Sequence, residues 1–176
     1  VAAQLVNLLY NIVDRIYIGH IPGIGTDALA GIGVTSAVIV LISSFSAIVG
    51  AGGSPLAAIA LGRGNRERAG QILGNGFILL LIFTILTSAT TYLFMEPILL
   101  FTGASENTIG YATDYLSIYL LGTLFVELSV GLNTFINTQG RPTIAMYSVL
   151  IGAILNIGLD PLFIFTFGMG VKGAAL

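Results

Sequence analysis

One polar stripe runs through the apolar start of the chain. Gln4, Asn7, Asn11 and Asp14 follow one another at spacings of three, four and three residues. In a helix these spacings put all four side chains on one face. An ionised Asp near the centre of a bilayer costs about 2.5 kcal/mol or more, so this face must meet protein or water rather than lipid. We expect it to border an aqueous cavity; the alternative is a buried hydrogen-bonded network that only fixes helix packing.

A second polar group lies near the far end of the chain, in NIGLDP. Asn156 and Asp160 are four residues apart and share a helix face. Pro161 has no backbone N–H and therefore frees a carbonyl one turn back, near Ile157. An amide oxygen, a carboxylate and a free carbonyl are ligands that hard cations prefer.

These two groups together predict an ion-coupling site. If Asp14 approaches Asn156 and Asp160, two carboxylates share one pocket, and such a pair favours binding of a proton or of Na⁺. We therefore expect Asp14, Asn156 and Asp160 to couple transport to H⁺ or Na⁺. Gln4, Asn7, Asn11 and Glu127 are weaker candidates that we expect to line the cavity, Glu127 because of its depth in an apolar segment.

The composition indicates which solvent surrounds these residues. Apolar residues make up 56% of the 176 and charged residues only 8%, and the mean hydropathy is +0.99. Soluble domains carry about 25% charged residues, so the chain lacks a surface suited to water. A net charge of −2 gives no reason to expect a nucleic-acid partner. The absence of cysteine excludes disulfides and thiolate metal sites, and we expect no cofactor.

Long uncharged runs predict an all-α integral membrane protein, a bundle of about five transmembrane helices and the start of a sixth. A span needs about 20 mostly apolar residues. Within GAGGSP, residues 50–55, we expect the second helix to bend or break. Because residue 1 is Val within an apolar run and VKGAAL begins another, we expect the sequence to be part of a longer protein. The expected spans are 1–19, 27–60, 69–97, 107–137 and 142–167, with the sixth beginning at 170–176.

Basic residues predict the orientation in a plasma membrane. Arg63, Arg66 and Arg68 lie between the second and third spans, and Arg141 lies between the fourth and fifth. By the positive-inside rule, the loops at 61–68 and 138–141 are expected to be cytoplasmic. Arg15 lies about 100° round the helix from Asp14, so we expect it to extend to the outer interface rather than to pair with that acid.

Two stretches carry a family resemblance. YNIVDRIYIG and LNIGLDPLFIF, in this order, resemble the multidrug and toxic compound extrusion (MATE) family, in particular its bacterial MepA-like branch. GRGNRERAGQILGNG and FGMGVKGAAL are similar to the segments between those motifs, so the resemblance covers essentially the whole chain. The departures from the family pattern are Asn137 and Thr138, in place of an Arg-Ala pair, and Glu127, in place of an apolar residue.

The resemblance implies a fold and an activity. Family members have twelve spans in two six-helix lobes around a central cleft, so this chain would be most of the N-terminal lobe and its partner the missing C-terminal lobe. The family exports cationic drugs and metabolites in exchange for Na⁺ or H⁺, and its ion-site residues match Asp14, Asn156 and Asp160. The protein is then a transporter and not an enzyme, with the lipid bilayer and small organic cations as its partners.

Two alternatives remain open at the level of sequence. A lipid-linked oligosaccharide flippase of the same superfamily would need cleft arginines for pyrophosphate, and Arg15 is the only base within a span. A structural membrane protein that only scaffolds partners would have no need of two deep acids on aligned polar faces.

Overall fold

The chain folds into a bundle of helices. The structure is a computed structural model and describes residues 2–175, except for the side chains of residues 2–8, 10 and 11. No strand occurs within residues 2–175, so the predicted all-α bundle is confirmed. The elements are α1 (Ala2–Gly19), α2 (Gly25–Gly62), α3 (Arg66–Leu93), α4 (Met95–Phe101), α5 (Ile109–Thr138), α6 (Pro142–Pro161), the π-helical turn η1 (Leu162–Thr166) and α7 (Val171–Ala174).

Four of the helical segments are long and apolar enough to cross a membrane. They are Gly25–Gly62, Arg66–Leu93, Ile109–Thr138 and Pro142–Thr166, the last of which joins α6 to η1. Many of their large apolar side chains are exposed, such as Ile48 at 67% and Leu121 at 78%. In a bilayer these side chains contact lipid, because lipid tails are as apolar as they are. The shorter α1 is not among the four because its polar residues lower its hydropathy.

Local sequence explains where several helices begin. Asn65 is the N-cap of α3, and its side-chain oxygen accepts a 2.9 Å hydrogen bond from the backbone N–H of Arg68. Such a cap satisfies one of the N–H groups that the first turn leaves free. Pro142 stands at the start of α6, where its missing N–H is not needed.

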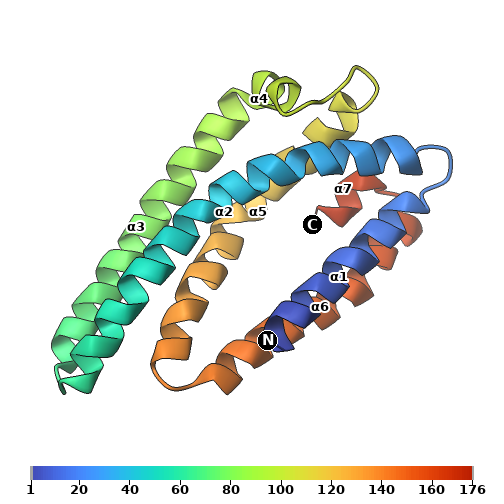
Figure 1. The fold of residues 1–176 in the computed structure, drawn as a ribbon. Coiled ribbons are helices and arrows are strands. Elements are labelled where there is room, and N and C mark those ends of the chain that lie inside the picture. Colours follow the sequence, from blue (N-terminus) through green and yellow to red (C-terminus); the bar gives the residue numbers. More distant parts are fainter. Residues whose placement is uncertain (1, 176) are drawn as a thin grey trace.

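Two sets of packed helices make up the bundle. In one, α2 packs against both α3 and α5; in the other, α1 packs against α6 (Figure 1). The ribbon places α1 and α6 side by side on one flank and α3 on the other, with the long α2 passing between them. At the end of the bundle where α1 connects to α2, an apolar cluster joins the two sets, and it includes Ile18 of α1, Ile32 of α2, Tyr115 of α5 and Ile164 of η1.

Small residues allow α2 and α5 to approach closely. A Cβ atom on Gly31 would lie 2.9 Å from the Thr108 carbonyl oxygen, and one on Gly50 would lie 2.7 Å from Thr134 Oγ1. Both distances are too short for an undisturbed contact. Because glycine has no side chain, the neighbouring helix occupies the space that a side chain would fill, as is usual where membrane helices pack tightly.

The GAGGSP segment does not break α2. The helix is continuous from Gly25 to Gly62, with Pro55 inside it. Pro55 removes one hydrogen bond, but packing on the neighbouring helix holds the segment: Ser54 Oγ donates to the Thr134 carbonyl, at 3.3 Å. Gly50 and Gly53 therefore serve close packing against α5 rather than a turn.

The two glycines of the second turn of α2 make a matched pair for testing this packing. Gly31 meets the α5 backbone, whereas a Cβ atom on Gly33 has nothing within 4 Å. We expect Gly31→Ala to lower the thermal unfolding midpoint of the full-length protein in detergent, because α5 must move to admit the methyl group. Gly33→Ala should leave the midpoint unchanged or raise it, since Ala is better in a helix by about 1 kcal/mol. Equal midpoints for the two variants would contradict the close approach.

Candidate functional site

The candidate ion site lies where α1 packs against α6. On α6, Asn156 Nδ2 donates a 3.0 Å hydrogen bond to Asp160 Oδ1, so the amide orients the carboxylate one turn away. Asp160 is buried, with 4% of its surface exposed. The predicted sharing of a helix face by these two residues is confirmed by this bond.

Asp14 faces this pair from α1. It is half-buried, and its charge and that of Asp160 lie close enough to repel each other. Within the described side chains, Asp14 Oδ1, Asn156 Oδ1 and Asp160 Oδ2 are buried and make no hydrogen bond. Oxygens without partners on two facing helices are costly in an apolar interior unless something else satisfies them. A small cation or a proton would do so.

The backbone changes its winding immediately after Asp160. Pro161 ends α6, and the next five residues form the π-helical turn η1, closed by a 2.9 Å bond from the Phe167 N–H to the Leu162 carbonyl. Turns of this type are rare and occur mostly as single-turn interruptions of α-helices. The Tyr17 ring of α1 meets the Phe165 ring of η1 edge to face, with centroids 6.4 Å apart. This contact holds α1 against the altered turn.

Sequence reasoning missed Tyr115 of α5, which lies near the candidate ion site. Tyr115 is buried in the apolar cluster that joins the two packed sets, and it lies within electrostatic reach of both Asp14 and Asp160. Its ring stacks on that of Tyr119, with centroids 6.2 Å apart. A phenol can donate and accept hydrogen bonds without carrying charge. The available signal was the spacing of four between two tyrosines, which puts them on one face of the helix.

Other polar candidates fall outside this group. The side chains of Gln4, Asn7 and Asn11 lie outside the described residues. Arg15 is exposed, and its Nη2 lies 3.4 Å from Ser36 Oγ, so its polar contact is with α2. Glu127 lies on α5 and accepts a 2.7 Å hydrogen bond from Ser43 of α2. It therefore sits in the α2–α5 interface and not beside Asp160.

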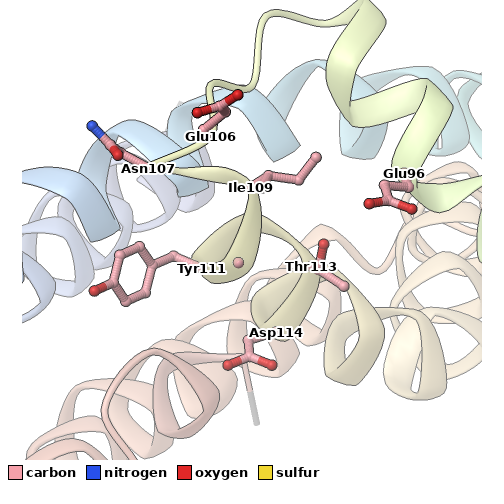
Figure 2. Close-up of a pocket in the computed structure, with 8 residues that line it drawn as sticks. Glu96, Glu106, Asn107, Ile109, Tyr111, Thr113 and Asp114 are labelled. Carbon is pink, nitrogen blue, oxygen red and sulfur yellow. The ribbon is translucent and has the colours of Figure 1, made fainter.

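A separate hollow opens between α4 and the start of α5. It has a volume of about 530 Å³, and its lining includes Glu96, Glu106 and Asp114 (Figure 2). Asp114 forms a half-exposed ion pair with Lys172, at 3.2 Å. Exposed pairs contribute little to stability. Because none of Asp14, Asn156 and Asp160 lines this hollow, it is distinct from the candidate ion site.

Comparison with known proteins gives one family. The MatE family model matches residues 1–162. The chain is 34% identical over 172 residues to an FAD transporter of Shewanella oneidensis, covering 95% of the chain and 37% of that protein. It is 28% identical over 173 residues to the multidrug export protein MepA of Staphylococcus haemolyticus, covering 98% and 38%. The chain thus spans less than two fifths of the length of these relatives.

Solved structures share the fold. Crystal structures of MATE in the straight and in the bent conformation each match with a TM-score of 0.89 and 30% identity, covering 99% of the chain and 38% of those chains. The predicted resemblance to this family, including its MepA-like members, is confirmed.

The hydrogen bond between Asn156 and Asp160 can be tested by exchanging its partners. Asn156→Asp removes the amide donor and places two carboxylates one turn apart, which should destabilise the full-length protein by about 1.5–3 kcal/mol. The double variant Asn156→Asp/Asp160→Asn again has one amide and one carboxylate at this spacing and should recover most of the loss. Thermal unfolding in detergent measures both, with the half-exposed Asp114→Asn as control. A double variant no more stable than the single one would argue against the bond.

Proposed function

The chain belongs to the MatE family, and on this premise we propose that it forms part of an ion-coupled antiporter. The whole protein exports cationic drugs or toxic metabolites in exchange for Na⁺ or H⁺ by alternating access. The observation that carries the proposal is that α1 packs against α6 with Asp14 within electrostatic reach of Asp160 of the Asn156–Asp160 pair, and that each of the three residues has an unpartnered oxygen. A polar face bordering a substrate path explains these groups, and a scaffold does not.

The coupling step is a neutralisation. A proton or Na⁺ entering from outside binds among Asp14, Asn156 and Asp160 and removes the repulsion between the two carboxylates. The contact between α1 and α6 then changes, α1 bends or repacks, and the cavity contracts and releases the cation outward. A MATE protein crystallises with straight and bent conformations, and both match this chain equally well. Release of the ion inward resets the cycle.

The available driving force is adequate for export. One elementary charge that crosses the membrane potential is worth about 2.3 kcal/mol per 100 mV. In this cycle, binding of the ion and binding of the drug need only be mutually exclusive. Each ligand then shifts the equilibrium between the two conformations of the transporter by the difference in its affinity for them.

The proposed setting is the plasma membrane, with the remaining lobe as partner. In this proposal the loops 61–68 and 138–141 lie on the cytoplasmic side, because they carry the arginines at 63, 66, 68 and 141 and the positive-inside rule favours basic residues there. The spans 1–19, 27–60, 69–97, 107–137 and 142–167, with a sixth beginning at 170–176, form one six-helix lobe in this proposal. Gln4, Asn7 and Asn11 line its cleft.

A second substrate class is an anionic dinucleotide, because one relative is an FAD transporter. FAD carries a pyrophosphate, which proteins usually bind with arginines. Arg15 is the only Lys or Arg well inside a helix of this part of the chain, and it contacts Ser36. This favours the cation, and it argues against a pyrophosphate-linked lipid for the same reason.

Coupling is tested with the full-length protein in proteoliposomes. Efflux of a fluorescent lipophilic cation is recorded under an imposed Na⁺ gradient and then under an imposed pH gradient. We expect one gradient to drive efflux in the wild type and Asp14→Asn to abolish it, since the variant keeps the shape of the side chain but not its charge. Asp114→Asn, outside the site, should retain efflux. Gradient-driven efflux that persists in Asp14→Asn would overturn this role of Asp14.

Substrate class is tested by competition in the same vesicles. Unlabelled lipophilic cations should inhibit dye efflux, and FAD added on the loading side should not. Inhibition by FAD alone, together with gradient-driven FAD movement, would replace the cation with a dinucleotide as substrate.

A further inference from the structure

Glu127 is a buried acid that the proposed coupling site does not use. Only 1% of its surface is exposed. One carboxylate oxygen, Oε1, accepts the 2.7 Å hydrogen bond from Ser43 Oγ, while Oε2 is buried and has no partner among the described side chains. A carboxylate with one free oxygen in an apolar interior is costly unless a positive charge compensates it.

The described residues of α2, α3 and α5 supply no such charge at this depth. In α2 the charged residue is Asp27, in the first turn, and in α3 they are Arg66, Glu67 and Arg68, also in the first turn. Glu127 is level with neither group, because it contacts Ser43 in the middle of α2. The other titratable groups of the packed helices are Tyr92 near the end of α3 and, along α5, Tyr111, Asp114, Tyr115 and Tyr119. None of these is a cation.

The register of α3 brings hydroxyl groups to this level. A Cβ atom on Gly131 would touch Leu80, and one on Gly76 would lie 3.2 Å from Phe135, so α3 and α5 run antiparallel in steps of four. Four residues further along α3 from Leu80, and four residues back along α5 from Gly131, Thr84 is level with Glu127. The next step of four makes Ser88 level with Thr123. Thr84 is buried, and Ser88 Oγ is buried without a partner. A Glu side chain leans towards the N-terminus of its helix, here towards the level of Ser88.

We propose that Glu127, Ser43 and Ser88 form a second binding site for a small monovalent cation, between α2, α3 and α5. The cation occupies the free side of the carboxylate, and the two hydroxyls complete its oxygen surroundings. Oxygen ligands without His or Cys suit a hard cation and not a transition metal. The positive charge is carried by Na⁺ or by a proton, and the two are separated by experiment.

This site is distinct from the proposed coupling site. Asp14, Asn156 and Asp160 lie on α1 and α6, whereas the residues here lie on the three helices of the other packed set. The inference does not need transport to occur. Its readout is therefore ion-dependent stability, which stays measurable if the antiporter proposal fails.

The experiment uses the full-length protein in detergent with Asp14→Asn and Asp160→Asn, which silence the α1–α6 acids. In one arm Na⁺ replaces choline at constant ionic strength and fixed pH; in the other, Na⁺ is absent and the pH is lowered. A ligand that binds only the folded state raises the thermal midpoint with its concentration. We expect such a rise in one arm, which identifies the ion, and we expect Glu127→Gln to abolish it.

Two controls keep the result decisive. Asp114→Asn, on the same helix but half-exposed, should keep the ion-dependent rise of the thermal midpoint. Subtraction of the midpoints measured for Glu127→Gln removes the contribution of the other titrating acids. Ser43→Ala keeps the carboxylate and should shift the half-saturating Na⁺ or proton concentration by about tenfold, which serves if Glu127→Gln does not fold. Absence of any ion-dependent rise in the background, or a rise that Glu127→Gln and Ser43→Ala leave unchanged, would overturn the site.

Discussion

Acidic side chains buried inside an apolar helix bundle are the constraint on which this structure depends. Asp14, Glu127 and Asp160 are all at least half-buried, and each has a buried oxygen without a hydrogen-bond partner among the described side chains. Among residues 2–175, Arg15 is the only Lys or Arg well inside a long helix, and its polar contact is Ser36. Lipid tails cannot replace the hydrogen bonds that water makes with an acidic side chain, so the bundle must place each acid against another helix.

The bundle meets this constraint in two different interfaces. The α2–α5 interface is close-packed through glycines such as Gly31 and Gly50, so Glu127 and Ser43 are held in one arrangement. The α1–α6 interface is joined to the rest at its ends. At one end the link is the apolar cluster around Tyr115, and at the other end Asn133 Nδ2 donates to the Ala145 carbonyl, at 3.1 Å.

The parts of this picture that depend on spacing along the chain could be predicted from sequence. Hydropathy predicts the membrane helices, and a spacing of four predicts that Asn156 and Asp160 share a face. The bond between Glu127 and Ser43 joins residues 84 positions apart and depends on the register of two helices, which no local pattern encodes. The continuity of α2 through GAGGSP has the same cause, because contacts with α5 outweigh the local preference of glycine and proline. Tyr115 was missed for that reason too.

The difference between the two interfaces separates the roles of the acids. A change of charge alters structure only where the packing has a second arrangement of similar free energy. Asp14 is half-buried on a helix that packs mainly against α6, so in the proposed cycle α1 responds when its carboxylate is neutralised. Glu127 is buried between helices that include the closely approaching α2 and α5, so binding of the proposed cation there would hold the same arrangement more firmly. The two proposed sites are therefore complementary, because in the proposed cycle movement of α1 and α6 has an effect only against a part of the lobe that does not move.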